Sequence, residues 1–230
     1  MSETLEVINE SIDQKTSLHH TVVNAAKIVA MQDNPELAKS VNEADLINAD
    51  GAAVVWASKL LGNPLKERVA GIDIFTNLVA NAHLRNESVY LLGATEEVVE
   101  KVVEKFTAQY GNTIIGGYRN GYFKQQDEQA IVSDIVASGA TYLFVAMTSP
   151  KKEIFLYEHR EKLSKLGFIM GVGGSFDVVS GKVKRAPLFM QKLGLEWFFR
   201  LIQEPRRLFK RYFVQNLKFI LLLFKAYFTK

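Results

Sequence analysis

The sequence predicts an α/β fold built on a parallel sheet, followed by a helical and basic C-terminal appendage. Short apolar runs alternate with amphipathic segments from about residue 18 to residue 180, which is the pattern of successive βαβ units. This alternation ends near Ala186, and the rest of the chain is rich in aromatic and basic residues. We therefore expect a core in residues 1–190 and an appendage in residues 191–230.

The expected strands are apolar runs that stop at a polar residue or a glycine. They fall at residues 19–24, 46–47, 88–92, 113–115, 141–146 and 168–172. Helical patterns lie between them, and the clearest is Glu96–Tyr110, in which Val98, Val102 and Phe106 recur at helical spacing. Further helices are expected at residues 4–12, 25–31, 35–41, 69–84, 125–137, 151–165 and 195–201, directly after Gly51, and from residue 205 onward.

The composition is that of a folded chain with a sizeable core. At 230 residues, 48% of them apolar, the chain fits one α/β domain with an appendage and is too apolar for a disordered protein. It has no cysteine, which excludes disulfides and thiolate chemistry and is compatible with a reducing cytoplasm. The N-terminus lacks the apolar region of a signal peptide, and no apolar run approaches the ~18–20 residues of a membrane span.

Charge is distributed unevenly along the chain. Residues 196–230 contain eight basic and two acidic residues, a net charge of +6, which leaves −3 for residues 1–195. Such asymmetry indicates an anionic partner at the C-terminal end: nucleic acid, a membrane surface or a phosphate group. A nucleic-acid partner is not expected, because more basic surface and a base-reading element would be needed.

Asp50 is the first candidate for chemistry. It follows the apolar run Leu46–Ile47 and precedes Gly51 and a helical pattern, so it is expected at the carboxyl end of a strand, where open parallel sheets bind ligands. A carboxylate there can act as a general base. It can also be a cap of the helix that follows and nothing more.

Glycines follow three of the predicted strands, at Gly93, Gly173 and Gly174. Glycine turns let a backbone approach a phosphate or a sugar, and they also simply allow tight turns. None belongs to a dinucleotide-binding or P-loop motif. Asp73 and Asp177 also follow apolar strands or turns and are expected to converge with Asp50, but there is no D-x-D run for a metal–nucleotide and no metal-ligand spacing among the histidines.

Basic residues occur at two further positions of interest. Lys151 and Lys152 sit at a predicted helix N-terminus, where they oppose the helix dipole; a bound anion would explain them, and a solvated surface pair is the alternative. In the appendage, Arg200, Arg207 and Arg211 fall at helical spacing, and guanidinium groups suit phosphate oxygens.

Seven motifs occur in order between residues 18 and 213: N-A-D-G (48–51), E-R-V-A-G-I-D (67–73), L-L-G-A (91–94), G-Y-R-N-G-Y-F (117–123), S-P-K-K-E (149–153), G-V-G-G-S-F-D-V-V-S-G-K-V-K-R-A-P (171–187) and G-L-E-W-F-F-R-L-I-Q-E-P-R-R (194–207). Together they resemble the WecG/TagA/CpsF glycosyltransferases of bacterial surface-polysaccharide synthesis. The resemblance implies a Rossmann-like core and a metal-independent, inverting transfer. The sugar, N-acetylmannosamine, its uronic acid or another hexose, would pass from a UDP-sugar to an undecaprenyl-pyrophosphate-linked sugar at the cytoplasmic face of the membrane. It implies no cofactor and leaves a homo-oligomer open.

The resemblance also assigns roles to residues. It implies Asp50 as the base, Asn24 in the same site, and Arg200 and Arg207 at the pyrophosphate, to which we add Arg211. The residues expected to bind substrate are Asn24, Gly51, Asp73, Gly93, Lys152, Glu153, Gly173, Gly174 and Asp177. Two positions depart from the family pattern: Val22 replaces a threonine, and Lys152 replaces a glutamine and adds a charge to the expected sugar or phosphate contact.

Two other functions remain open from the sequence. One is a non-catalytic nucleotide-sugar-binding protein anchored to the membrane by its tail. The other is a nucleic-acid-binding α/β protein, which only the basic tail suggests. Residues 205–230 carry basic groups among apolar ones and are expected to lie as a helix in the interface of an anionic membrane. The alternative is that residues 219–224 pack on the core or on another subunit.

Overall fold

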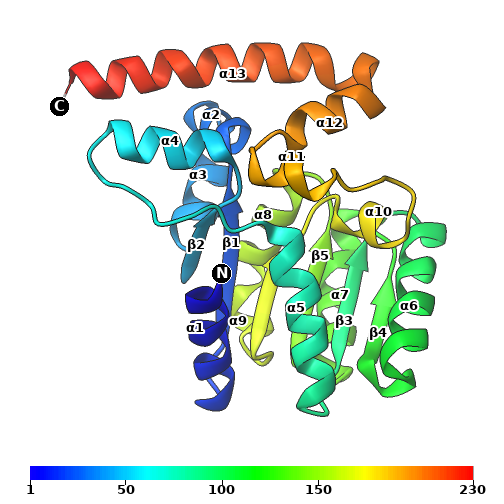
Figure 1. Ribbon diagram of the computed structural model, residues 1–230. Helices are drawn as coiled ribbons and strands as arrows, with labels where there is room; N and C mark the ends of the chain where they lie inside the picture. Colours follow the sequence, from blue (N-terminus) through cyan, green and yellow to red (C-terminus); the bar gives the residue numbers. More distant parts are fainter. Residues whose placement is uncertain (230) are drawn as a thin grey trace.

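The computed structural model describes residues 1–229, and the side chains of these residues except Lys192, Arg207, Leu208, Lys210 and Arg211. Six parallel strands form one sheet in the order β2-β1-β6-β5-β3-β4 (Figure 1). Their bounds are β1 Leu18–Val23, β2 Leu46–Ala49, β3 Val89–Gly93, β4 Ile115–Arg119, β5 Tyr142–Ala146 and β6 Phe168–Gly171. The predicted Rossmann-like α/β core is confirmed.

Helices connect successive strands and cover both faces of the sheet, as parallel pairing requires. Those of the core are α1 Ser2–Asp13, α2 Ala25–Asp33, α3 Pro35–Asn42, α4 Ala52–Leu60, α5 Gly71–Leu84, α6 Glu96–Tyr110, α7 Glu128–Ala137, α8 Lys151–Glu158, α9 Arg160–Leu163 and α10 Ser175–Val179. Those of the C-terminal segment are α11 Leu188–Lys192, α12 Glu196–Gln203 and α13 Pro205–Phe228. Short 3₁₀ turns lie at η1 Asn112–Ile114 and η2 Gln125–Asp127.

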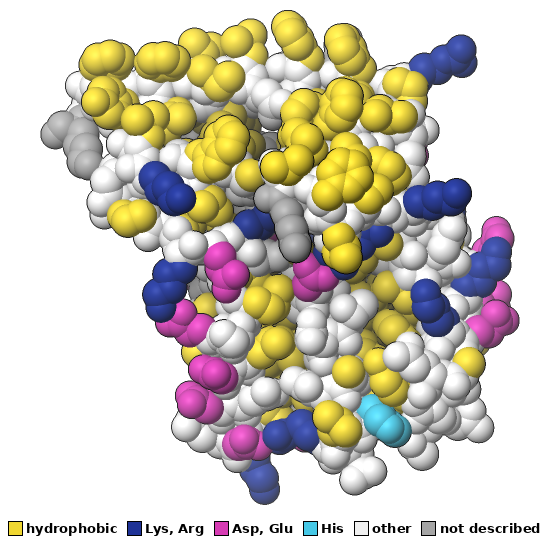
Figure 2. Space-filling model, in the orientation of Figure 1, with side chains coloured by type: hydrophobic (Ala, Val, Ile, Leu, Met, Phe, Trp, Pro, Cys, Tyr) yellow, Lys and Arg dark blue, Asp and Glu magenta, His cyan; other side chains and the backbone are white. Residues whose placement is uncertain are grey.

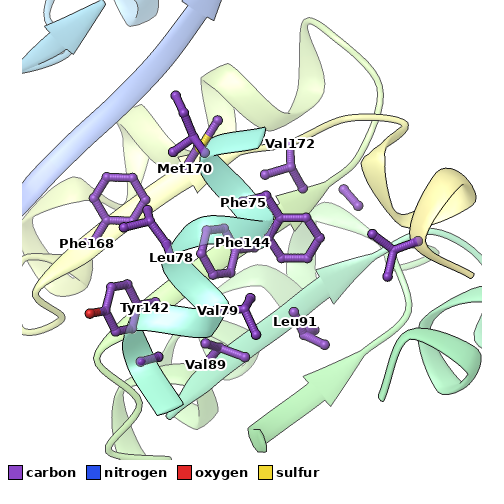
Figure 3. Packing of buried hydrophobic residues seen from close by; sticks show 14 of the residues in the cluster. Phe75, Leu78, Val79, Val89, Leu91, Tyr142, Phe144, Phe168, Met170 and Val172 are labelled. Carbon is purple, nitrogen blue, oxygen red and sulfur yellow. The ribbon is translucent and has the colours of Figure 1, made fainter. Parts of the chain in front are cut away.

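The core has two layers because neighbouring residues of a strand point to opposite faces of the sheet. On one face Leu91, Phe144 and Met170 lie in register and pack with α5 (Figure 3). There the ring centroid of Phe75 lies 4.6 Å from that of Phe144 and 5.5 Å from that of Phe176. On the other face the neighbouring strand residues, such as Leu92 and Val145, pack with α7 and α8. Burial on both faces explains why the strands read as continuous apolar runs.

The fourth strand differs from its prediction. Residues 113–115 were expected as a strand that ends before the glycine pair, whereas β4 runs from Ile115 through both glycines to Arg119. A side chain on Gly117 would lie 2.6 Å from the ring of Tyr90, its partner across β3, so the large ring requires glycine opposite it. The predicted bounds were wrong because a glycine inside a strand, required by a large side chain on the neighbouring strand, cannot be distinguished by sequence alone from a glycine that ends a strand.

All six strands end at the same edge of the sheet, and the C-terminal segment crosses that edge (Figure 1). Among the described residues, no helix combines the length and the apolar character needed to cross a membrane. Helix α13 packs on the core through Phe219, which is buried against Val29 of α2 and Ala57 of α4. The alternative that residues 219–224 pack on the core therefore holds for Phe219 and for the partly buried Leu222 and Leu223 beside it, whereas Ile220, Leu221 and Phe224 stay exposed.

Gly93, the last residue of β3, supplies a test of the fold. Gly93 has φ +131°, and a Cβ added there would lie 2.5 Å from the backbone of Ala146 on the neighbouring strand. We expect Gly93→Ala to lower the free energy of unfolding by about 2 kcal/mol more than Gly139→Ala, since overpacking adds about 1–3 kcal/mol. Gly139 is a matched control because it also has positive φ, +68°, but has open space around it. Urea denaturation measures both, and equal losses would contradict the packing described here.

Candidate active site

Asp50 follows β2 at the carboxyl edge of the sheet, next to the end of β1. Strands β1 and β2 pair in parallel register up to Val23 and Ala49, and the backbone N–H of Asp50 donates to the carbonyl oxygen of Val23 over 2.8 Å. Asn24 follows β1, and a Cβ on Gly51 would lie 3.5 Å from its Cβ. The structure thus brings together Asp50, Gly51 and Asn24. The Asn24 side chain caps α2 by accepting the N–H of Lys27 at 3.0 Å.

The carboxylate of Asp50 does not cap the helix that follows it. Among the described residues no side chain caps α4, whose N-cap position is Gly51. Instead, Asp50 Oδ2 accepts the backbone N–H of Gly71, at the start of α5, over 3.2 Å. Its Oδ1 lies 3.5 Å from Nε of Arg68. The helix-cap alternative for α4 is therefore wrong, and the carboxylate is held by groups distant in sequence.

Burial raises the pKa of Asp50 above its ordinary value. The Arg68 guanidinium and the Gly71 N–H oppose this increase, and the nearby Glu196 carboxylate adds to it. The side chain nevertheless keeps 30% of its surface accessible, so a substrate can reach it. A partly desolvated carboxylate with a raised pKa is a better proton acceptor than an ordinary aspartate.

A chain of ion pairs leads from Asp50 to the C-terminal segment. Arg68 contacts Asp50 through Nε and forms a short ion pair with Glu196, the first residue of α12, through Nη2. The other oxygen of Glu196 lies 3.5 Å from Nε of Arg185. Arg185 in turn forms a bidentate ion pair with Asp73 of α5, in which its two terminal nitrogens lie 2.6 and 2.8 Å from the carboxylate oxygens. Asp73 is thus an anchor for Arg185 in this structure.

Sequence reasoning missed Arg68, Arg185 and Glu196 as members of this site. All three lie inside motifs that had been singled out, E-R-V-A-G-I-D, G-K-V-K-R-A-P and G-L-E-W, so the signal was a charged residue within each motif. The positions of the three are separated by up to 128 residues, and nothing in the local pattern says which charges pair.

Arg200 lies one turn after Glu196 on α12, and its guanidinium reaches the turn that follows β6, residues 172–174, here called the β6 turn. A Cβ on Gly174 would lie 3.9 Å from Nη2 of Arg200 and 3.9 Å from Oδ2 of Asp177. Asp177 also pairs with Lys182 at 3.4 Å. A small cavity beside α12 is lined by three cations and a single acid, together with apolar groups: Lys184, Arg185, Arg200, Glu196, Ile72, Val178 and Ala186. Because Arg185 is already paired with Asp73 and Glu196, Lys184 and Arg200 are the cations of this cavity better placed to contact an anionic group.

Lys152 and Glu153 are buried beneath the β6 turn. Only 8% of the Lys152 side chain is accessible, and its Nζ lies 2.5 Å from Oε1 of Glu153. Lys27 approaches the same oxygen at 2.7 Å. Burial lowers the pKa of Lys152, while the two ammonium groups outweigh burial at Glu153 and hold its pKa below the ordinary value. The solvated-pair alternative is therefore wrong for Lys152.

The carboxylate of Glu153 shows why this buried group remains a candidate for substrate contact. Its second oxygen, Oε2, is buried and has no hydrogen-bond partner within the described part of the chain. A buried acceptor of this kind is costly unless a donor satisfies it.

The methylene carbons of Lys152 lie against Gly171, where an added Cβ would be 3.0 Å from Cδ of Lys152, and close to Gly173.

Gly93 lies farther from Asp50 than the other predicted residues. Strand β3 is four positions from β2 in the sheet, which corresponds to roughly 19 Å at the usual strand spacing. Gly93 therefore belongs to the same edge but not to the immediate surroundings of Asp50. The side chains of Arg207 and Arg211 lie outside the described residues, and their expected phosphate contacts stay predictions.

A group with metal-ligand chemistry lies elsewhere. Within residues 1–229, Glu128, Glu158 and His159 place ligand atoms within 4.8 Å of one another, at the end of α8 remote from Lys152. His159 Nε2 and Glu128 Oε2 are 3.1 Å apart, a contact that joins α7 to α8. None of these residues belongs to the predicted site.

Comparison with known proteins assigns the chain to a family. The sequence pattern of the "Glycosyl transferase WecG/TagA/CpsF family" matches residues 1–230. An N-acetylglucosaminyldiphosphoundecaprenol N-acetyl-beta-D-mannosaminyltransferase of Bacillus spizizenii is 40% identical over 178 residues, which cover 77% of this chain and 68% of the relative. A protein of the same name from Bacillus subtilis is 38% identical over 196 residues, covering 85% and 75%. The chain therefore belongs to the WecG/TagA/CpsF family of glycosyltransferases.

Proposed function

We propose that this glycosyltransferase moves N-acetylmannosamine, or a closely related hexose, from a UDP-sugar to an N-acetylglucosamine linked to undecaprenyl diphosphate. The choice of transferred sugar and of lipid-linked acceptor is supported by the names of the two relatives, which state both. The observation that carries the proposal is the position of Asp50, at the carboxyl edge of the sheet, with a raised pKa and beside the Arg68 guanidinium.

Asp50 acts as the general base. In a direct displacement, a hydroxyl of the acceptor sugar attacks the anomeric carbon of the donor and inverts its configuration. The Asp50 carboxylate takes the hydroxyl proton as the new C–O bond forms and the bond to the diphosphate breaks. The N–H of Gly71 and the guanidinium of Arg68 hold the carboxylate in place for this transfer.

The departing diphosphate requires positive charge, and basic side chains supply it. Arg200, Arg185 and Lys184 line one cavity next to α12, and Arg200 also acts electrostatically on Asp50. Fixed cations directed at a developing negative charge lower the barrier without reorganising during the reaction. On this basis we propose a transfer that needs no metal ion.

Replacing the base provides the main test. Asp50→Asn should lower turnover by about 10²–10⁴-fold, because removal of a general base typically costs that much. Asp45→Asn is the matched control. Asp45 lies just before β2, at the end of that strand opposite to Asp50, and its carboxylate accepts the backbone N–H of His19. Release of UDP with a short-chain diphosphate-linked N-acetylglucosamine acceptor measures both variants.

The same assay separates the alternative of a non-catalytic nucleotide-sugar-binding protein. No turnover of the parent with any UDP-hexose would favour that alternative. Turnover of a correctly folded Asp50→Asn variant within a few-fold of the parent would refute the role of Asp50 while leaving the transferase intact.

We further propose that the enzyme binds the inner face of the cell membrane through its C-terminal segment. Apolar side chains gather over α11, α12 and α13 on one side of the molecule (Figure 2). On α13 they form a continuous exposed stripe, here called the outer stripe, of Phe213, Leu217, Ile220, Leu221, Phe224 and Phe228. Exposed residues of α11 and α12 extend it: Leu188, Phe189, Leu193, Trp197, Phe198 and Ile202.

A membrane surface matches both the apolar and the charged groups of this segment. The outer stripe points away from the core, since the core side of α13 is occupied by Phe219. Lys218 and Lys225 lie on the same helix, exposed to solvent. Each basic group near an anionic membrane contributes about 1 kcal/mol of binding, and apolar side chains in the acyl boundary add to it. Docking would place α12 and Arg200 close to the lipid diphosphate.

Substitutions in the outer stripe test this role. We expect the triple variant Leu217→Gln, Leu221→Gln and Phe224→Gln to lose co-sedimentation with anionic liposomes. Stability should change little, because the three side chains are 51%, 61% and 57% exposed. The matched control is Val7→Gln with Leu84→Gln, which removes exposed apolar groups from α1 and α5, away from the C-terminal segment.

Two results would contradict the membrane proposal. One is a triple variant that sediments as the parent does; the other is a parent that never binds liposomes at low salt. If the parent instead doubles its mass in solution and the triple variant does not, the outer stripe is an interface of a homo-oligomer.

A further inference from the structure

Glu196 belongs to the appendage, yet its carboxylate lies in the active site. It is the first residue of α12, and both of its oxygens face guanidinium groups: one is paired with Arg68, and the other lies 3.5 Å from Nε of Arg185. Arg68 is therefore shared between two carboxylates, those of Asp50 and Glu196. The sharing is unequal, because Arg68 approaches Glu196 closely and stays 3.5 Å from Asp50.

We propose that Glu196 is a positioning residue for the transfer reaction: it draws the Arg68 guanidinium toward α12 and so keeps Asp50 free to accept a proton. The inference rests on the proposed role of Asp50 as general base. It gives the C-terminal segment a part in the chemistry that is separate from membrane binding and from contact with the diphosphate.

The physical reason is competition for one cation. A guanidinium can bind a carboxylate through two parallel hydrogen bonds, which would stabilise the ionised form of Asp50 and weaken it as a base. In the structure, Nη2 of Arg68 is directed at Glu196 and Nη1 lies 3.5 Å from the carbonyl oxygen of Gln191 on α11. Only Nε is left for Asp50, at a distance longer than a good hydrogen bond.

No other charged group named around Asp50 replaces Glu196 in raising the pKa of this carboxyl. Arg200 of α12 acts on Asp50 in the same direction as Arg68, and the Gly71 N–H at the start of α5 also favours the ionised form. Burial and Glu196 act in the opposite direction and raise the pKa. Without the Glu196 charge, two arginines and an N–H would face the Asp50 carboxylate, with burial alone opposing them.

Glu196 is itself held in place by the core. Arg185, which contacts one of its oxygens, is fixed by its bidentate pair with Asp73 on α5. Placement of α12 against the core therefore sets the position of the Arg68 guanidinium.

The test is the pH dependence of kcat/KM in the full chain with Glu196→Gln, which keeps the size of the side chain and removes its charge. The acidic limb should move to lower pH by about half a pH unit or more, since a nearby cation lowers the pKa of a carboxyl. On the plateau the rate should fall a few-fold, because a weaker base transfers the proton less effectively. Glu196→Asp, which keeps the charge, should restore most of the limb position.

Gln203→Ala is the control for loosened docking. The Gln203 amide joins α12 to the backbone N–H and carbonyl of Lys184, at 3.2 and 3.1 Å, and carries no charge. Its loss should lower the rate but move the limb less than Glu196→Gln does. A limb that coincides with that of the parent in Glu196→Gln, or that moves equally in Gln203→Ala, would overturn the inference. If Asp50→Asn is inactive and the limb stays unmoved, only this inference fails; if Asp50→Asn remains active, the proposed base fails with it.

Discussion

The parallel pairing of six strands is the constraint on which the rest of this structure depends. Parallel strands need helical crossovers on both faces, so the sheet is buried on both sides and all its strands end at one edge. Asn24 and Asp50 directly follow the paired strands β1 and β2 and come together for this reason. The C-terminal segment then crosses the same edge and brings α12 onto it.

Charge is organised in two separate networks at this edge. The first is an alternating series of carboxylates and guanidiniums, Asp50, Arg68, Glu196, Arg185 and Asp73, that joins the core to α12. The second lies below the β6 turn, where two lysines share the carboxylate of Glu153. The first network is partly open to solvent and faces the cation-lined cavity, whereas the second is almost fully buried. Removing the Glu153 carboxylate would leave two buried ammonium groups without a counter-charge, which is strongly destabilising.

Helix α13 carries apolar groups on two sides, of which one packs on the core and the other is exposed. Phe219 faces inward and packs on α2 and α4, while the outer stripe is exposed. The helix is thus attached to the core by one side and leaves the other available. This arrangement explains how a helix that is not apolar enough to cross a membrane can remain part of the folded molecule and present an extended apolar surface.

The sequence by itself determined the α/β class, most element positions, the turn after a strand that carries Asp50 and the change of character after Ala186, because these follow from local periodicity and turn residues. Motifs in the sequence also indicated the family that the comparisons show. Only the tertiary structure decided that Asp50 binds the start of α5 rather than capping α4, that Lys152 is buried, and that Arg68 is shared with Glu196. Ion pairs between residues more than a hundred positions apart depend on how the helices pack, and no local pattern records which charges will meet.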